Sequence, residues 1–433
     1  PATNTDPTPA THAWTISGAP VPVTAYCGQI LTQSIILRND LHDCVWDGLI
    51  VGAGGITIDL NGHTIDGIGV AAGIRNDGHA SVTIKNGVVS EFDYGVMLNP
   101  RVEKNIVEFM TLENNQEAAI ALGHVPHPLS PQLPFPDPAP PTFQAGVRDV
   151  ILRNNSIRAN DVGIWLTNGT RGTLIRANEI YASTGDGVWI QRSHDNRVEA
   201  NQIDASGGAG VALEGSSNNS VVSNSLLENG GGVHLGVTDS SSGSIPSNHN
   251  LVENNGITES GAPGIELEGA STSSLVGNRI IGNVATFSNG EGISLYYARE
   301  TLILGNDLRA NMEGISLMNS SHNRLEANDA SEQSGTGISL QALSLANELV
   351  GNTSSNNQGS GIYVGDEVSG DSGTLIEGNR THNNVGYGIQ VAKVSHIIRN
   401  NIANENGSWG IYASEGSNGR HNVDGGGNRG QGN

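Results

Sequence analysis

Two short phrases repeat along most of this 433-residue chain, out of step with each other. One contains an asparagine that recurs mostly 22 to 28 residues after the previous one, and the other reads Gly-(Ile/Val)-x-(Leu/Ile/Val). A period near 22 with short alternating strands is typical of a solenoid in which each repeat is one coil of β-strands. The asparagines are Asn155, Asn178, Asn201, Asn224, Asn255, Asn278, Asn306, Asn328, Asn352, Asn379 and Asn401. The motif glycines are Gly73, Gly95, Gly163, Gly187, Gly210, Gly232, Gly264, Gly292, Gly314, Gly337, Gly361, Gly388 and Gly410.

The period predicts the architecture. A coil of about 22 residues holds three strands of about 4 to 5 residues with their turns, and stacked coils lie about 4.8 Å apart. We therefore expect an all-β, single-domain parallel β-helix of about 13 coils. The Ile and Leu of each motif point inward and the x residue outward, because side chains alternate along a strand. The repeated asparagine is expected at a bend, where it accepts unusual backbone angles and its amide bonds to the asparagine of the next coil.

The ends of the chain differ from its repetitive middle. Cys27 and Cys44 are the two cysteines, and we expect one disulfide that staples a cap over the first strand edge. Disulfide use indicates an oxidising compartment. The expected segments are an arm or linker at 1–26, the cap and first coil at 27–72, the parallel β-helix at 73–420, and a Gly-rich tail at 421–433.

Charge and hydropathy narrow the classes of partner. The 21 Lys and Arg against 43 Asp and Glu give a net charge of -22, which argues against nucleic acid binding. A polyanionic substrate is also repelled unless a local basic patch or bound Ca²⁺ offsets the field. No run of 18 apolar residues predicts a membrane span. The Pro/Thr-rich start at Pro1 resembles the exposed start of a processed protein, so we expect a secreted or cell-surface location.

Three insertions follow directly after a motif strand. They occupy the Pro-rich segment between Gly123 and Gly146, then Thr238 to Asn248, and then Asp366 to Gly373. All three leave along the same edge of the rod, where they can wall one side of a groove. Solenoid loops also accumulate insertions that have no function. The first insertion contains His124 and His127, whose spacing suits a metal but is often incidental in a loop.

Aromatic side chains mark the outward face of the motif strands. Trp165 and Trp189 occupy the x position in successive coils, so they are expected to stack in the solvent. An exposed aromatic platform holds the apolar faces of sugar rings, which predicts carbohydrate subsites. The alternative is that the Trp pair glues the Pro-rich loop to the rod. The predicted substrate-binding residues are Trp165, Trp189, Gln191, Arg192 and Tyr363.

Beside the Trp pair, Glu214, His234, Glu266 and Glu268 form a predicted catalytic cluster with Tyr296. Such a cluster lets one group be protonated while another is ionised. Glu214 and Glu266 are two coils apart, about 9.6 Å by strand spacing, near the 6.5 to 9.5 Å of an inverting glycosidase. The bland alternative is an ordinary solvated acidic face.

The second chemistry is proton abstraction next to a uronate carboxylate. His234 would act as the base and Tyr296 as the acid, which gives β-elimination or epimerisation, with Arg192 or a metal on the carboxylate. A Ca²⁺ ion among Glu214, Glu266 and Glu268 would make this scheme electrostatically tolerable in an acidic chain. No cofactor is required by any motif, so Ca²⁺ is an expectation from charge alone.

The coil repeats, the Cys27/Cys44 cap and the phrase from Asp59 to Ile65 together resemble the right-handed parallel β-helix proteins of the pectin-lyase-like superfamily. The resemblance covers residues 27–420 and is nearest to mannuronan C5-epimerase-like proteins, polysaccharide lyases and carbohydrate-binding β-helix proteins. It implies a right-handed coil and polysaccharide binding on the outer groove. The chain lacks the Asp-Pro-His phrase of alginate epimerases and the paired-Asp and Gly-His-Gly set of polygalacturonases. No catalytic residue is therefore carried over.

Together these patterns predict a secreted polysaccharide-processing enzyme, a lyase or epimerase that acts on a uronate-containing polysaccharide in an outer groove. The alternatives are a glycoside hydrolase that uses a carboxylate pair, and a non-catalytic carbohydrate-binding or cell-surface structural β-helix. The sugar, its linkage and the oligomeric state stay open.

Overall fold

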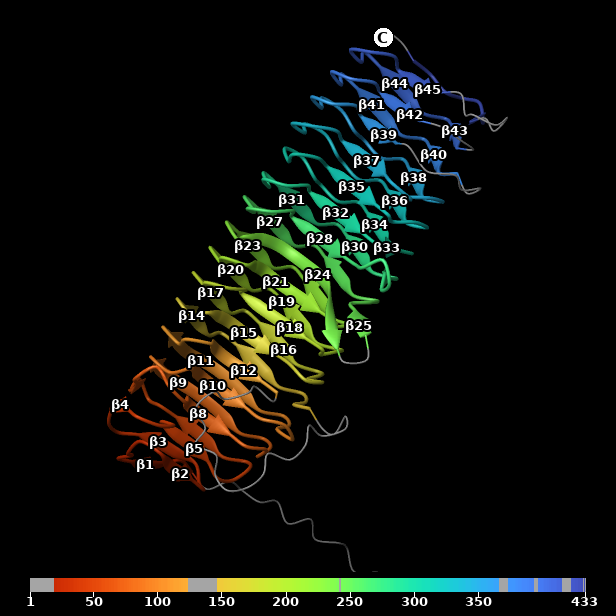
Figure 1. Cartoon of the computed structure of the whole chain (residues 1–433). Coiled ribbons are helices and arrows are strands. Elements are labelled where there is room, and N and C mark those ends of the chain that lie inside the picture. The colour runs from red at the N-terminus through yellow and green to blue at the C-terminus, as the bar shows by residue number, and fades with distance from the viewer. Residues whose placement is uncertain are drawn as a thin grey trace, which may run out of the picture.

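The protein is a rod built from stacked coils of β-strand (Figure 1). A computed structural model describes residues 19–123, 146–240, 243–365, 373–392, 396–414, 422–430 and 432. Within these residues the chain forms a right-handed parallel β-solenoid of about 15 turns, and no helix occurs there. The predicted all-β parallel β-helix is thus confirmed.

One sheet runs the length of the rod and carries the Gly-(Ile/Val)-x-(Leu/Ile/Val) motif, so we call it the motif sheet. Its strands pair in parallel from coil to coil, in a register that matches each motif with the next. Its strands are β2 (Gln29–Leu31), β5 (Leu49–Val51), β8 (Ala72–Asn76), β10 (Tyr94–Leu98), β12 (Ala118–Leu122), β15 (Val162–Leu166), β18 (Val188–Gln191), β21 (Ala209–Glu214), β24 (Gly231–Ser240), β28 (Ile265–Glu268), β32 (Ile293–Tyr296), β35 (Ile315–Met318), β37 (Ile338–Gln341), β39 (Ile362–Val364), β42 (Ile389–Val391) and β45 (Ile411–Ala413).

Two further stacks complete each coil, and most of their strands have three residues. The second sheet contains β1 (Val21–Val23), β3 (Ile35–Leu37), β6 (Thr57–Asp59), β9 (Thr83–Ser90), β11 (Ile106–Glu113), β13 (Ile151–Arg153), β16 (Leu174–Arg176), β19 (Arg197–Glu199), β22 (Ser220–Val222), β26 (Leu251–Glu253), β30 (Arg279–Ile281), β34 (Leu302–Leu304), β36 (Arg324–Glu326), β38 (Glu348–Val350), β40 (Leu375–Glu377), β43 (Ile397–Arg399) and β46 (Val423–Asp424). The third sheet contains β4 (Leu41–Cys44), β7 (Thr64–Gly67), β14 (Ser156–Arg158), β17 (Glu179–Tyr181), β20 (Gln202–Asp204), β23 (Ser225–Leu227), β27 (Gly256–Thr258), β31 (Val284–Thr286), β41 (Arg380–His382) and β44 (Ile402–Asn404), and the long strands β9 and β11 pair with both sheets. The short strands β29 (Leu275–Val276) and β33 (Ala298–Arg299) pair with each other.

The coil count differs from the predicted 13 because three strands of the motif sheet lack the motif. Strands β2 and β5 already continue the sheet below β8. Strand β12 pairs with β10 and β15, but Ala119 stands where other coils have glycine. A search by glycine therefore skips this coil. At Gly187, by contrast, an added Cβ would lie 2.7 Å from the carbonyl oxygen of Gly210, so the coils approach too closely there for a side chain.

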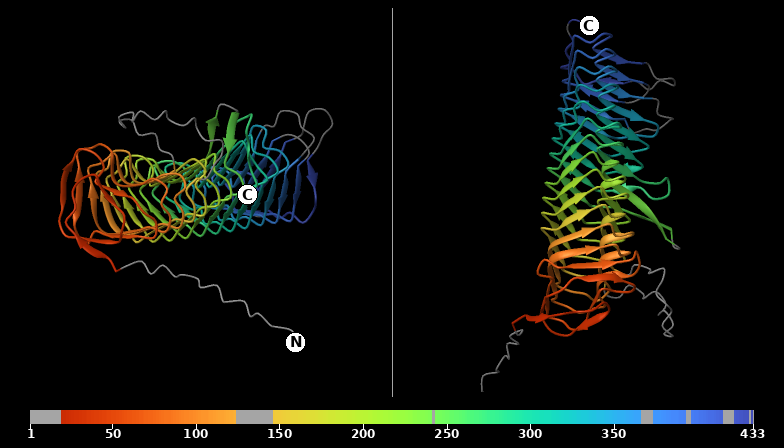
Figure 2. Two further views of the ribbon diagram at one scale, coloured as in Figure 1. Left: turned by 90° about the horizontal axis from the view of Figure 1, so that it is seen from below. Right: turned by 90° about the vertical axis from the view of Figure 1, so that its left-hand side faces the viewer.

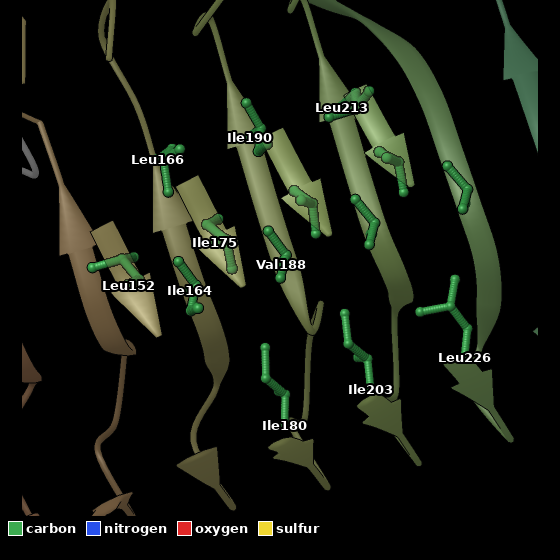
Figure 3. Close-up of a cluster of buried hydrophobic side chains, with 14 of the residues drawn as sticks. Leu152, Ile164, Leu166, Ile175, Ile180, Val188, Ile190, Ile203, Leu213 and Leu226 are labelled. Atoms are coloured by element: carbon green, nitrogen blue, oxygen red, sulfur yellow. The ribbon is translucent and has the colours of Figure 1, made fainter. Parts of the chain in front are cut away.

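The interior of the rod is filled by the inward residues of all three sheets (Figure 3). Ile164 and Leu166 from β15 lie against Ile175 from β16 and Ile180 from β17, and all four are essentially inaccessible to solvent. Each fully buried aliphatic side chain of this size contributes about 1.5 to 3 kcal/mol. Because every coil supplies several of them, the apolar interior is the main source of stability.

Asparagine ladders close the bends between the strands. Asn201 Nδ2 donates to Asn224 Oδ1 at 2.9 Å and to the carbonyl of Ile175 at 3.0 Å, and its Oδ1 accepts from the backbone N–H of Asn178 at 3.0 Å. The predicted ladder is confirmed. The left-handed backbone angle, however, falls on the residue before each asparagine, such as Ala200 with a φ of 52°.

One member of the predicted asparagine series was assigned to the wrong bend. Asn255 Nδ2 donates to Asn283 Oδ1 at 3.0 Å, so Asn283 continues the ladder in that coil. Asn278 belongs to a second ladder, where it accepts from Asn250 Nδ2 at 3.3 Å. Both bends of this coil carry an asparagine, five positions apart, and an insertion in the preceding coil shifts the apparent period. Counting along the sequence cannot tell the two ladders apart.

A disulfide joins Cys27 and Cys44 near the first coils, as the sequence predicts. The insertion at Thr238–Asn248 forms a hairpin, in which the end of β24 pairs antiparallel with β25 (Gly243–Pro246). Figure 2 shows this green hairpin standing out from the side of the rod. The Pro-rich segment with His124 and His127, and most of the third insertion, lie outside the described residues. Of the three insertions that were expected to wall a groove, the structure therefore describes the one at Thr238–Asn248.

Candidate functional site

Two rows of side chains point outward from the middle of the motif sheet. The residues of each row lie opposite one another in register, one coil apart. The Trp165 row contains Trp165, Trp189, Ala212, His234, Glu266 and Ser294. The Gln191 row contains Gln191, Glu214, Gly236, Glu268 and Tyr296.

The two indole rings of the Trp165 row stack in parallel. Their centroids are 4.8 Å apart and their planes differ by 8°. Both side chains are half-buried, less exposed than the sequence predicted. They pack against a small outer cluster that includes Tyr94, Met97 and Ala121, apart from the main core. The pair can still offer an aromatic face, but part of its surface already serves packing.

His234 and Glu266 form a hydrogen-bonded pair on adjacent coils. His234 Nδ1 lies 3.1 Å from Glu266 Oε2, and the two side chains are 25% and 35% exposed. Burial lowers the pKa of His234, but the bond to Glu266 and the charges of Glu266, Glu268 and Glu214 outweigh it and raise the pKa above its usual value. The pairing fixes the ring and leaves its second nitrogen for chemistry.

Gly236 makes room for that second nitrogen. An added Cβ at Gly236 would lie 2.6 Å from His234 Nε2, so the imidazole ring lies along its own strand over the glycine. Gly236 is opposite Glu214 in one direction and Glu268 in the other. The free ring nitrogen therefore lies between two carboxylate-bearing positions. Sequence reasoning missed this role, although the small residue between two acids of one row is visible in the chain.

The register corrects the carboxylate pair that the sequence proposed for hydrolysis. Glu266 is opposite His234 and Ala212, whereas Glu214 is opposite Gly236 and Glu268. Glu214 and Glu266 are therefore offset by two residues along the strands as well as by two coils, and their Cα atoms are about 12 Å apart. The aligned pair is Glu214 and Glu268, at about 9.6 Å.

Asp186 belongs to the electrostatic surroundings of the cluster, which the sequence did not indicate. It accepts a hydrogen bond of 2.7 Å from the backbone N–H of Ala209, so it serves the turn before β21 as expected. Burial raises its pKa, and Glu214 adds to the rise while His234 opposes it. An acid just before a motif glycine is the signal that identifies it. Glu313 likewise lies just before a motif glycine, Gly314. Burial and the charge of Glu291 raise the pKa of Glu313 to about 7.

The predicted substrate-binding residues Arg192 and Tyr363 and the predicted catalytic residue Tyr296 have differing surroundings. Arg192 donates through Nη2 to the backbone carbonyl of Asp239, so it fastens the β24–β25 hairpin to the end of β18. Tyr296 is 38% exposed and contacts Tyr297 edge to face, with centroids 4.5 Å apart. Tyr363 lies four coils beyond Glu266, next to Gln390 in register, and is remote from the cluster.

A metal-competent group lies within the cluster. Three potential ligand atoms lie within 4.8 Å of one another, one each from His234, Glu266 and Glu268. This set differs from the predicted trio, in which Glu214 stood in place of His234. A shallow depression of about 320 Å³ also exists on the third sheet, lined by Arg158, Tyr181 and Asp204 among others. It is on a different sheet from the cluster and adds nothing to it.

The sequence matches the family described as the right-handed β-helix region over residues 142–250 and 243–396, which together cover more than half of the chain. The chain belongs to this family. No curated protein matches the sequence. No helix in the described part of the chain is long and apolar enough to cross a membrane.

Several solved structures are similar to this chain at low sequence identity. The A-module of mannuronan C-5 epimerase AlgE6 from Azotobacter vinelandii is 11% identical, with 95% of this chain and 89% of that chain covered and a TM-score of 0.41. The periplasmic alginate epimerase AlgG is 12% identical, with 93% and 77% covered and a TM-score of 0.39. DFA-IIIase from Arthrobacter chlorophenolicus A6 is 13% identical, with 62% and 70% covered and a TM-score of 0.43.

Proposed function

We propose that this protein is a secreted polysaccharide lyase or epimerase that removes a proton beside the carboxylate of a uronate unit, with His234 as the base. The hydrogen-bonded His234–Glu266 pair on the outer face is the observation that carries the proposal. A carboxylate on Nδ1 holds the ring and stabilises the imidazolium that forms when Nε2 takes a proton. The disulfide supports an extracellular location.

Tyr296 supplies the acid in this scheme. His234 Nε2 takes the C5 proton of the uronate, and the electron pair moves toward the carboxylate. In β-elimination the pair then forms the C4=C5 double bond, the C4–O bond breaks, and the leaving oxygen takes a proton from the Tyr296 hydroxyl. In epimerisation the Tyr296 hydroxyl instead returns a proton to C5 from the opposite face. Tyr296 follows Glu268 in the Gln191 row, one coil away.

Proton abstraction fits the cluster better than hydrolysis. The Cα atoms of Glu214 and Glu266 are about 12 Å apart, so this pair is less well aligned across the coils than Glu214 and Glu268. Between the aligned Glu214 and Glu268, the ring of His234 extends over Gly236, where hydrolysis needs a water. The stacked Trp165 and Trp189 one to three coils away provide a surface for neighbouring sugar units.

The test uses the full chain with a panel of uronate and neutral polysaccharides in D₂O. Deuterium entering at C5, read by NMR, reports epimerisation, because a β-elimination product keeps no hydrogen at C5. Ultraviolet absorbance from the new double bond separates the two. We expect His234→Gln to lower the rate by about 10²- to 10⁴-fold. His322→Gln is the matched control, because His322 is exposed and distant from the motif-sheet cluster.

Three results would overturn the proposal. Reducing ends without deuterium incorporation or absorbance would make the protein a hydrolase. Full activity in His234→Gln would show that His234 is not the base. Binding without any turnover across the whole panel would leave a carbohydrate-binding rod.

A further inference from the structure

The cluster also has the composition of a metal site. His234 from β24 and Glu266 and Glu268 from β28 place three potential ligand atoms within 4.8 Å of one another. Glu266 and Glu268 are two residues apart on one strand, so both side chains leave the same face. His234 and Glu266 are half-buried and Glu268 is exposed, which keeps one side of the group open to solvent.

The distances suit one small divalent ion. Two ligands bound to the same ion at about 2.0 to 2.2 Å lie about 3.4 Å from each other in a tetrahedral site. The 3.1 Å between His234 Nδ1 and Glu266 Oε2 is close to this value. Glu268 is exposed and long enough to close the remaining gap by rotation about its own bonds.

Charge favours a cation at this position. Three carboxylates, Glu214, Glu266 and Glu268, face one imidazole, and their charges already act on His234. Arg192, the positive side chain at the end of the neighbouring strand, is engaged with the hairpin carbonyl of Asp239. A divalent ion would neutralise a concentration of negative charge that no Lys or Arg of the two rows offsets.

The donor set selects the kind of ion. Ca²⁺ prefers six to eight oxygen ligands, whereas imidazole with carboxylates suits Zn²⁺, Mn²⁺ and related transition metals. The metal expected here therefore differs from the Ca²⁺ that charge alone suggested.

We propose that His234, Glu266 and Glu268 bind one divalent transition-metal ion, and that the bound metal switches off proton abstraction because it occupies the imidazole. The metal site stands on its own geometry, and its inhibitory effect rests on the proposed function. When a metal binds Nδ1, the neutral ring keeps its one proton on Nε2, so Nε2 has no lone pair to accept the substrate proton and the two states of His234 exclude each other.

Isothermal titration of the chelator-treated full chain with ZnCl₂ tests the site without any substrate. We expect one saturable Zn²⁺ site per chain, with CaCl₂ giving no saturable heat. His234→Gln and Glu268→Gln should each weaken binding by about 100-fold, while thermal unfolding shows that both variants remain folded. His322→Gln and Glu179→Gln are controls, because both residues are exposed and lie away from the motif-sheet cluster.

Two binding results would overturn the metal site. One is Zn²⁺ binding that His234→Gln leaves unchanged. The other is binding that disappears when His124 and His127 are replaced together, because the metal would then belong to the Pro-rich segment.

The second arm measures activity on any substrate that the proton-exchange assay identifies. We expect stoichiometric Zn²⁺ to abolish deuterium incorporation by an epimerase, or the absorbance change by a lyase, and a chelator to restore it. Activation by Zn²⁺ would overturn the inhibitory role and leave the site itself intact. If no substrate is found, the titration still decides the metal site, so failure of the function and failure of the metal site are distinguishable.

Discussion

The bends of this solenoid and the outer face of its motif sheet use side chains in opposite ways. At the bends the same residue returns, as in Asn178, Asn201 and Asn224, with nearly the same hydrogen bonds each time. On the outer face around the cluster the residue differs from coil to coil, from Trp189 through Ala212 and His234 to Glu266. The backbone needs of a bend are identical in every coil, so one side chain serves them all. Chemistry needs unlike groups side by side.

The largest expected effect is at a bend. Asn201→Ala removes hydrogen bonds to Ile175, Asn178 and Asn224 and leaves several buried polar groups without partners. At about 1 to 3 kcal/mol for each orphaned group, we expect a loss of about 4 kcal/mol in the free energy of unfolding. Chemical denaturation measures the loss. Gln202→Ala is the control, since Gln202 is exposed one position further on. Equal losses of stability in both variants would show that the asparagine ladder does not stabilise the fold.

A change on the outer face should lower activity and leave stability nearly unchanged. Glu266→Gln keeps the shape of the side chain but removes the charge that supports His234. We expect kcat to fall about 10- to 100-fold, with KM and the thermal midpoint nearly unchanged, because the imidazolium loses its partner. Steady-state kinetics on chelator-treated protein measures both constants. A matching rise in KM would instead place Glu266 in direct contact with the sugar.

Glu313 tests whether a charged carboxylate at the edge of the motif sheet lowers the stability of the fold. Burial and the charge of Glu291 raise its pKa from the usual 4.5 to about 7, against a hydrogen bond from Ser316 that lowers it. The folded state therefore binds more protons than the unfolded state between these values, and stability falls as the pH rises from 4.5 to 7. We expect Glu313→Gln to be more stable than the wild type by about 1 to 2 kcal/mol above pH 7, after allowing for solvent screening.

Denaturation at a series of pH values measures this difference. The advantage of Glu313→Gln should vanish below pH 4.5, where the wild-type carboxyl is protonated in both states. A constant difference at all pH values would show a packing effect rather than a charge effect.

The Trp pair gives the smallest expected effect and decides between two interpretations. If Trp165 holds sugar, Trp165→Ala should weaken polysaccharide binding by about five- to tenfold, equivalent to about 1 kcal/mol, with kcat unchanged. Trp409→Ala is the control, because Trp409 is 64% exposed and far along the rod. A drop in thermal stability with intact binding would instead make the pair a packing element of the cluster around Met97.

Much of the fold could be read from the chain. The period predicted three strands per coil, and the alternation of side chains put His234 and Glu266 on the same outward face, where they are opposite each other. The coil at Ala119 was missed because it lacks the motif glycine. Asn278 was assigned to the wrong ladder because two bends carry the same residue, five positions apart.

The details of the candidate site needed the structure. The ring of His234 lies over Gly236, between Glu214 and Glu268, and this placement bears on the choice between hydrolysis and proton abstraction. The half-burial of Trp165 and Trp189 depends on packing across several coils. Side-chain rotamers and packing of this kind are not encoded in the spacing of the motif.

The sequence by itself determined the coil, its inward and outward faces and the residues that share the face, because a repeated local pattern has one periodic solution. The tertiary structure decided where each side chain goes on that face. The ring of His234 lies over Gly236, its Nδ1 meets Glu266, and Arg192 turns to the hairpin carbonyl of Asp239. Such choices depend on rotamers, on neighbours far apart in sequence and on local charge, and a period carries none of that information.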